Sequence, residues 1–157
     1  MGLLKITIRK FKEGDAYELA ELIDKNRRKI SSLNQSQKAL KEMAARNTPP
    51  KLIEKSKDRS LFVAEFGSSL VGTAGLKGSQ VTGVFVKVSQ HGKGIGKKLM
   101  EKVEGKAEKK GVKKVFLYSS IYAVPFYEKL GYGKASGGKK ETDVVYREMV
   151  LMSKSLS

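Results

Sequence analysis

The stretch that most constrains this chain is an apolar segment followed by a glycine-rich turn and a helical pattern. It reads Val84-Phe85-Val86-Lys87-Val88-Ser89-Gln90-His91-Gly92-Lys93-Gly94-Ile95-Gly96-Lys97-Lys98-Leu99. A strand, a tight turn and a helix start in this order direct several backbone N–H groups at one point. Glycine lets the backbone approach an anion closely. The stretch therefore predicts a phosphate-binding site, to which Lys93, Lys97 and Lys98 add positive charge.

Two common phosphate motifs do not fit this stretch. The P-loop needs Ser or Thr where Lys98 stands, and the dinucleotide fingerprint needs glycine where Lys97 stands. The pattern that remains is [Q/R]-x-x-G-x-[G/A], with His91, Gly94 and Gly96 at its fixed positions. It resembles the acetyl-CoA pyrophosphate loop of the GNAT N-acetyltransferases. For this stretch alone, a strand-to-helix turn without a ligand is the alternative interpretation.

A second motif strengthens the resemblance. It reads Ser120-Ile121-Tyr122-Ala123-Val124-Pro125-Phe126-Tyr127-Glu128-Lys129-Leu130-Gly131-Tyr132. This segment resembles the GNAT pattern N-x-x-A-x-x-F-Y-E-K-L-G-F without a gap. Pro125 suits the first turn of a helix and Gly131 suits its left-handed end. One long helix and one strand separate the two motifs, as in that family, so the resemblance covers nearly the whole chain.

Apolar periodicity predicts an α/β fold. The expected strands cover residues 3–9, 60–66, 70–77, 81–88, 112–119, 132–135 and 144–152. The expected helices cover residues 15–29, with Asp15 as its cap, 36–46, 51–57, 94–110 and 123–130, and a mobile loop is expected over 136–140. The resemblance implies the GNAT acyltransferase fold: a mixed central sheet of about six or seven strands flanked by about four helices. One parallel pair of neighbouring strands is expected, bridged by the glycine-loop helix.

Length and composition limit the class of protein. With 157 residues the chain is expected to form one domain, residues 1–157. It has no cysteine and one histidine, which excludes disulfides and thiolate catalysis and argues against a metal site. No apolar run approaches the roughly 18 residues of a membrane span. The first residues alternate into a strand instead of forming a signal peptide, so we expect a cytoplasmic protein, as a monomer or homodimer.

The formal charge of +16 allows two interpretations. It can attract polyanions such as nucleic acid, or it can reflect a lysine-rich solvated surface. The lysines are spread along the chain among glutamates, without an arginine-rich block or interleaved aromatic residues. This favours the solvated surface and keeps a nucleic-acid-associated protein as an alternative.

The resemblance implies acetyl transfer from acetyl-CoA, a co-substrate, to an amine. A lysine-type amine has a pKa of about 10.4, a thiol about 8.5 and a tyrosine about 10, so a tyrosine held at the sulfur can protonate the leaving thiolate. Tyr127 stands where the family has its general acid, with Tyr122 and Tyr118 as substitutes. The structural alternative for Tyr127 is an amphipathic core residue.

The resemblance also implies which residues hold acetyl-CoA. They are Val84, Phe85, Val86, His91, Gly92, Lys93, Gly94, Ile95, Gly96, Lys97, Ser120 and Tyr127. Backbone N–H groups of residues 84–86 would polarise the thioester carbonyl and pair with the pantetheine amides. His91 replaces the usual Gln or Arg, and its neutral ring can donate one hydrogen bond to a phosphate. Ser120 either contacts CoA or caps a helix.

The general base and the acceptor stay open at this stage. Gln80 stands where some relatives have a catalytic glutamate, and Glu65 is the nearest acid, on a neighbouring strand. Glu65 fits better as an ordinary charged strand residue, so the amine either loses its proton through water or arrives neutral. In the family, residues 10–57 and 136–143 would select the acceptor. A basic protein repels polyamines. A non-catalytic acyl-CoA sensor is a further alternative.

Overall fold

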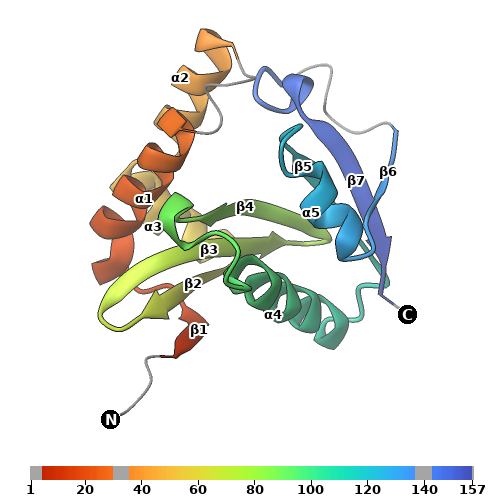
Figure 1. The fold of residues 1–157 in the computed structure, drawn as a ribbon, viewed down its shortest axis with the longest axis horizontal. Coiled ribbons are helices and arrows are strands. Elements are labelled where there is room, and N and C mark those ends of the chain that lie inside the picture. Colours follow the sequence, from red (N-terminus) through yellow and green to blue (C-terminus); the bar gives the residue numbers. More distant parts are fainter. Residues whose placement is uncertain (1–4, 30–35, 137–142, 157) are drawn as a thin grey trace.

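The computed structural model describes residues 5–29, 36–136 and 143–156, which form a mixed α/β structure (Figure 1). The strands are β1 (Ile6–Lys10), β2 (Ser60–Phe66), β3 (Ser69–Lys77), β4 (Gln80–Val86), β5 (Lys114–Ser119), β6 (Gly133–Lys134) and β7 (Val150–Ser155). The helices are α1 (Ala16–Lys29), α2 (Gln37–Arg46), α3 (Pro49–Asp58), α4 (Ile95–Lys109) and α5 (Val124–Lys129). Short 3-10 turns also occur among the described residues, namely η1 (Glu13–Asp15), η3 (Val88–Gln90) and η4 (Tyr146–Glu148).

The strands form one 7-stranded sheet in the order β1-β2-β3-β4-β5-β7-β6. Neighbouring strands run antiparallel, except that β4 and β5 are parallel. The chain between these two passes through the glycine turn and α4. The predicted mixed sheet, with one parallel pair bridged by that helix, is therefore confirmed.

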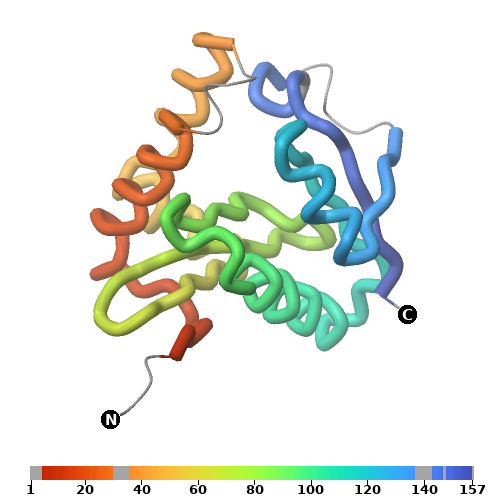
Figure 2. Tube along the Cα trace, in the orientation of Figure 1, coloured from red at the N-terminus to blue at the C-terminus, as the bar shows by residue number. Residues whose placement is uncertain are grey.

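Helices cover both faces of the first four strands (Figures 1 and 2). Successive strand residues point to opposite faces of a sheet. On β2, Phe62 and Ala64 pack in one core cluster with Leu99 and Val103 of α4. Val63, between them, packs in a second cluster with residues of α1 and α3. The alternation on a single strand thus separates α4 from α1 and α3.

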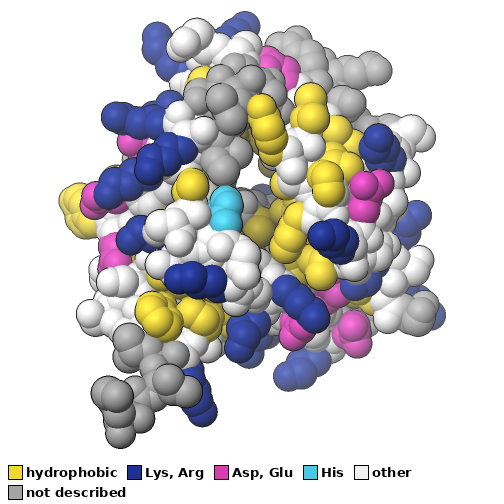
Figure 3. Space-filling view, viewed as in Figure 1, with side chains coloured by type: hydrophobic (Ala, Val, Ile, Leu, Met, Phe, Trp, Pro, Cys, Tyr) yellow, Lys and Arg dark blue, Asp and Glu magenta, His cyan; other side chains and the backbone are white. Residues whose placement is uncertain are grey.

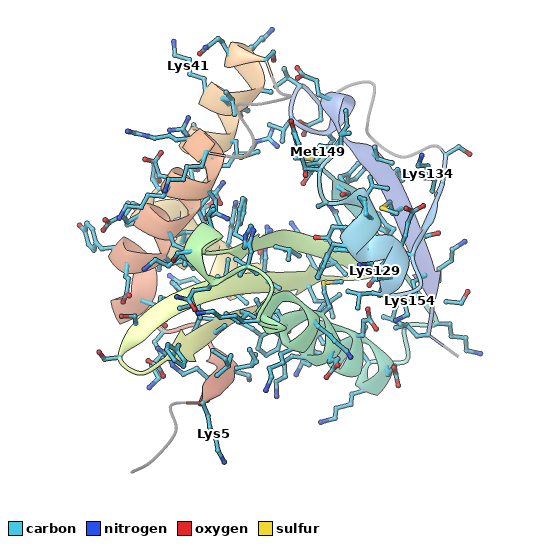
Figure 4. All side chains as sticks on the ribbon, viewed as in Figure 1. Lys5, Lys41, Lys129, Lys134, Met149 and Lys154 are labelled. Carbon is cyan, nitrogen blue, oxygen red and sulfur yellow. The ribbon has the colours of Figure 1, made fainter. Side chains whose placement is uncertain are left out.

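A half-buried carboxylate of α4 bonds to the second half of the chain. Glu104 of α4 accepts a hydrogen bond from the Tyr132 hydroxyl at 2.8 Å and pairs with Lys154 Nζ of β7 at 2.8 Å. Figure 4 shows Lys154 on β7 below α5. The Glu104 side chain is 13% exposed, so both bonds are shielded from water. This contact fixes where β7 and the end of α5 lie relative to the first half.

Several predicted boundaries need correction. The strand predicted over 81–88 ends at Val86, because the next residues turn as η3. The last strand, predicted from 144, begins at Val150, because η4 precedes it. The helix predicted over 51–57 begins at Pro49, because proline lacks the N–H that a first helical turn leaves unused.

The predicted cap at Asp15 is also different in the structure. The Asp15 carboxylate accepts the backbone N–H of Lys12 at 2.8 Å and pairs with Arg9, so it stabilises η1 before the helix begins. Residues 1–4 of the first predicted strand and 137–140 of the predicted loop lie outside the described residues. None of the helices in the described part is long and apolar enough to cross a membrane.

The distance between α4 and the sheet depends on Gly72 of β3. A Cβ built on Gly72 would lie 2.9 Å from Leu99 Cδ1 and 3.1 Å from the Phe85 carbonyl oxygen. Gly105, on α4 itself, has no atom within 4 Å of such a Cβ. An added methyl group would therefore clash with its neighbours at Gly72 and lie in open space at Gly105.

We expect Gly72→Ala to lower the free energy of unfolding by about 1–3 kcal/mol, because the close-packed core cannot admit the methyl group. Gly105→Ala, the matched control, should raise it by about 0.5–1 kcal/mol, since alanine loses less backbone entropy in a helix. Urea unfolding of the two variants measures both changes. Equal effects of the two substitutions would contradict the close approach at Gly72.

Candidate functional site

β4 and β5 part soon after they meet. They are in register where Gln80 lies opposite Phe116, and the Phe116 N–H donates to the carbonyl oxygen of Ser79 at 3.1 Å. Beyond this point Figure 2 shows the two strands running in different directions, with α5 following β5. Parallel neighbours that separate leave backbone groups on both inner edges open to a ligand.

A bulge in β4 accompanies the parting. Thr82 lies opposite Gly75 and Phe85 lies opposite Thr73, so β4 holds one residue more than β3 over this interval. Gly83 lies inside the bulge with a φ of 51°, a left-handed conformation that suits glycine. Such a bulge bends a strand and leaves the extra residue without a ladder partner. It therefore redirects β4 where the strands separate.

A cavity of about 790 Å³ fills the space between the parted strands and the helices. Figure 3 shows a hollow in this face, with hydrophobic side chains around it and the histidine beside it. Most residues predicted to hold the cofactor line the cavity. They are Val84, Phe85, Val86, His91, Gly92, Gly94, Ile95, Gly96, Lys97, Ser120 and Tyr127. Lys93 does not line it, and its ammonium binds Gln90 Oε1 at 3.1 Å.

The glycine turn has the backbone that an anion site needs. Gly92 and Gly94 have φ angles of 81° and 79°, and α4 begins directly after Gly94. The first N–H groups of a helix have no partner within it and carry its positive dipole end. A Cβ on Gly96 would lie 2.8 Å from the Phe126 ring, so α4 starts in contact with α5. The turn therefore presents free N–H groups at the cavity wall.

His91 makes a contact that the sequence does not indicate. Its Nε2 lies 2.8 Å from the Val86 carbonyl oxygen, which also accepts the Asn26 amide at 2.7 Å. Since a carbonyl only accepts, Nε2 donates in this contact. This bond occupies the single N–H that a neutral ring has, so the donation predicted for the neutral ring to a phosphate requires the bond to break. The Val86 carbonyl is likewise engaged by two side chains.

The three tyrosines of interest differ in burial. Tyr127 is 6% exposed, and its ring meets those of Phe126 and Tyr132 edge-on, with centroid distances of 5.0 and 5.7 Å. Burial raises the pKa of Tyr127 above its ordinary value. Tyr118 stacks on Tyr146 at 4.3 Å, whereas Tyr122 is 58% exposed. Tyr127 alone of the three is both buried and part of the cavity wall.

Ser120 serves the turn that leads into α5. Its hydroxyl accepts the Ala123 N–H at 3.3 Å, which matches the capping interpretation of this residue. Ser120 also lines the cavity, as its predicted contact with the cofactor requires.

Among the described residues, no Asp or Glu lines the cavity. Gln80, at the position of a possible base, has its amide 3.5 Å from the Tyr146 hydroxyl. Glu65 bonds to Arg9 of β1 at 3.3 Å, which is the ordinary ion-paired role expected for it. Within the same part of the chain, no three His, Asp or Glu side chains gather as metal ligands would.

A cluster of cationic side chains lies on the helix side of the cavity, and no pattern in the sequence predicts it. Arg46 of α2, Lys55 of α3 and Arg59, directly after α3, all line it. Lys55 is half-buried and its ammonium donates to the Asn47 side-chain oxygen at 3.2 Å. Burial chiefly, then the charges of Arg59 and Arg46, lower the pKa of Lys55 to about 8. Only the packing of α2 and α3 distinguishes these cations from the many solvated ones.

Asn26 is a further residue that sequence reasoning did not single out. It is buried on α1, where it follows Leu19 and Ile23 along the apolar stripe. A polar side chain on such a stripe needs a partner, and here the partner is the Val86 carbonyl. The presence of a polar residue in this apolar stripe is the feature of the sequence that could have identified Asn26.

Comparison with known proteins adds independent findings. The family model described as "Acetyltransferase (GNAT) domain" matches residues 21–155. No curated protein matches the chain by sequence.

Solved structures share the fold at low sequence identity. PaiA N-acetyltransferase from Thermoplasma acidophilum, in complex with coenzyme A, is 22% identical with a TM-score of 0.80, over 96% of this chain and 99% of that one. A GCN5-related N-acetyltransferase from Rhodopseudomonas palustris is 20% identical with a TM-score of 0.83, over 99% of both chains. N-acetylglutamate synthase from Neisseria gonorrhoeae, with coenzyme A and N-acetyl-glutamate, is 17% identical with a TM-score of 0.71, over 99% of this chain and 36% of that one.

The lowered pKa of Lys55 makes the stability of the protein depend on pH. The folded chain releases this proton at about pH 8, whereas the unfolded chain holds it to about 10.5. Between these values the unfolded state binds more protons, so the contribution of Lys55 to the free energy of unfolding rises with pH. Lys55→Met should remove this rise, and Lys57→Met, exposed on the same helix, should keep it. Urea unfolding across this pH range compares the two, and identical curves would contradict the assignment.

Proposed function

Because the chain belongs to the GNAT acetyltransferase family, we propose that it transfers an acetyl group from acetyl-CoA to a primary amine, with Tyr127 as general acid. The observation that carries the proposal is a single cavity. The glycine turn and the buried Tyr127 both line this cavity, together with residues of β4 and β5 where the two strands separate. Such a cavity gives an extended acyl thioester an anchor, a channel and a proton donor.

The pyrophosphate of acetyl-CoA would lie at the glycine turn. Free N–H groups at the start of α4 suit its charge, and Lys97 at the cavity wall adds to the attraction. Two structures of the same fold, those from Thermoplasma acidophilum and Neisseria gonorrhoeae, contain coenzyme A. The pantetheine arm would then follow the open edge of β4. Because the Val86 carbonyl is already engaged, pairing with the arm falls to other groups of residues 84–86.

Acetyl transfer would proceed by direct attack. The amine nitrogen forms a bond to the thioester carbon, the oxyanion accepts backbone N–H groups near the β4 bulge, and the C–S bond breaks. The thiolate takes a proton from Tyr127, and the phenolate regains one through water as the nitrogen, which becomes positively charged on attack, releases its own. Burial raises the pKa of Tyr127 and so keeps its hydroxyl protonated and available as a donor, and a buried sulfur would likewise disfavour the free thiolate. With no carboxylate among the described lining residues, water would carry off the amine proton, or the amine would arrive neutral.

The two other interpretations have their own tests. A non-catalytic acyl-CoA sensor would bind acetyl-CoA and release no thiol with any amine. A nucleic-acid-associated protein would bind RNA or DNA with steep salt dependence. Figure 3 shows Lys and Arg interspersed with Asp and Glu over this face, and pairs such as Lys25–Glu21 at 3.0 Å neutralise part of the charge. This mixture of charges argues against a nucleic-acid-binding face.

We expect Gly94→Ala to weaken acetyl-CoA binding about tenfold or more, because its methyl group keeps the phosphate from the N–H groups of the turn. The matched control is Gly78→Ala. Gly94 has a φ of 79° and Gly78 a φ of 61°, and neither has an atom within 4 Å of an added Cβ. Each substitution should therefore lower the free energy of unfolding by about 1–2 kcal/mol. Calorimetry with acetyl-CoA separates the two effects. Equal affinity in the two variants would show that the turn is only a turn.

We expect Tyr127→Phe to keep the fold and the acetyl-CoA affinity and to lower kcat by roughly 10²–10⁴, the usual contribution of acid–base catalysis. Because burial raises the pKa of Tyr127, the wild-type rate should show no alkaline fall from this group up to about pH 10. Thiol release with a panel of amines measures the rate, and Tyr122→Phe serves as control. An unchanged kcat in Tyr127→Phe would move the role to Tyr122 or Tyr118 or show that the thiolate leaves unaided.

A further inference from the structure

We propose that the amine acceptor carries an anionic group, a carboxylate or a phosphate, which Arg46, Lys55 and Arg59 bind on the helix side of the cavity. The inference rests on the acetyl transfer proposed above and names the chemical class of its acceptor.

The cavity wall is charged with one sign. Among its described lining residues, Arg46, Lys55, Arg59, Lys97 and Lys129 carry positive charge, and none is Asp or Glu. Lys97 belongs to α4, close after the glycine turn, and Lys129 to α5, whereas the other three come from α2, α3 and the residue after α3. The cations therefore form two groups by their elements, and Lys97 of the first lies next to the predicted pyrophosphate site. The second group has no ligand assigned to it.

Lys55 is a cation in need of an anion. Within the described part of the chain its hydrogen-bond partner is the neutral side-chain oxygen of Asn47, at 3.2 Å. The charges of Arg59, Arg46 and Lys51 oppose its positive charge, whereas the charge of Asp58 supports it. A partly buried ammonium without a carboxylate bonded to it is unfavourable until an anion arrives. The lowered pKa of Lys55 agrees, since a bound anion would restore the charged form.

The two arginines are held in position from outside the cavity. Arg46 pairs with Glu42 at 3.2 Å and with Asp143 at 3.1 Å, and Arg59 pairs with Asp58 at 2.8 Å. These bonds occupy Nε and Nη2 of each guanidinium, and a guanidinium has five N–H donors in all. Among the described residues Nη1 of neither group has a hydrogen-bond partner. Both side chains are thus oriented in advance and keep donors for a ligand.

One acceptor molecule can reach both the thioester and the cationic cluster. The cavity is continuous from the parting of the strands, lined by Gln80 and Thr82, to the cationic cluster. An acceptor with its amine at the thioester would place its far end among the helices. A polyamine would bring further positive charge to a wall of cations, which is unfavourable in a partly desolvated site. An amino acid or a phosphorylated amine would bring the complementary charge.

The first experiment compares matched acceptors in a thiol-release assay with acetyl-CoA at about pH 7, where the reference pKa values keep carboxylates ionised. The pairs are β-alanine with propylamine, L-lysine with cadaverine, and O-phosphoethanolamine with ethanolamine. The anionic member of a pair should have a kcat/KM about 10- to 100-fold higher, the usual value of hydrogen bonds to a charged group. The first two pairs report on a carboxylate and the third on a phosphate. Equal or better use of propylamine, cadaverine and ethanolamine would overturn the proposal.

The second experiment assigns the effect to Lys55. Lys55→Met should raise KM for the preferred anionic acceptor about tenfold, with a smaller change in kcat, and should bring the ratio within each pair towards one. Lys55→Arg should restore most of the preference. Lys57→Met, exposed on the same helix and outside the cavity wall, should leave the ratio as it is in the wild type. A ratio unchanged in Lys55→Met would remove Lys55 from the site.

A third measurement separates this inference from the acetyl transfer on which it rests. If acetyl-CoA binds and no amine releases thiol, the proposed function fails. Calorimetric titration of the CoA-bound protein with β-alanine and O-phosphoethanolamine then tests the anion site alone, in the wild type and in Lys55→Met. Binding that Lys55→Met weakens would support the cationic cluster as an anion site, and absence of binding in the wild type would overturn it. If propylamine and cadaverine are acetylated as well as their partners, acetyl transfer stands and the anionic acceptor does not.

Discussion

β4 and β5 are the parallel neighbours of the sheet, and they are in register where Gln80 lies opposite Phe116 before they part. The bulge at Gly83 bends β4 at this point, and α4 carries the chain across to β5. Because the two strands do not close on each other, the sheet keeps an internal opening instead of a continuous ladder. The cavity, the open backbone edge and the approach of α5 all depend on this separation.

The contacts of α4 keep that opening in place. Its buried face lies against β3 at Gly72, where the backbone admits no side chain, and its Glu104 holds Tyr132 and Lys154 of the second half. At its N-terminus, Gly96 contacts the ring of Phe126. One helix therefore sets the distance between the halves of the sheet and presents its own dipole end to the cavity. Structural support and the proposed anion site share the same element.

Cationic side chains line the cavity at two ends, which we propose bind different anions. Around the glycine turn, backbone N–H groups and Lys97 suit the phosphates of a cofactor, and on the helix side Arg46, Lys55 and Arg59 suit an anion on the acceptor. A net charge of +16 by itself says only that polyanions are attracted. The structure separates the solvated lysines, several of them ion-paired, from the few cations that packing directs inward. Among them, Lys55 has a lowered pKa, chiefly because it is partly buried.

The elements of this protein and its glycine turn follow from the sequence, because apolar periodicity, proline placement and glycine spacing act locally on the backbone. The α4 stripe of Leu99, Val103 and Ala107 is an example, as is the start of α4 after Gly94. Boundaries at η3 and η4 were missed, since short 3-10 turns have no strong periodicity. The hydrogen bond from His91 to Val86 and the cluster of Arg46, Lys55 and Arg59 were decided only in the tertiary structure. They join residues of separate elements, and their burial and charge environment exist only once α2 and α3 are packed beside the sheet.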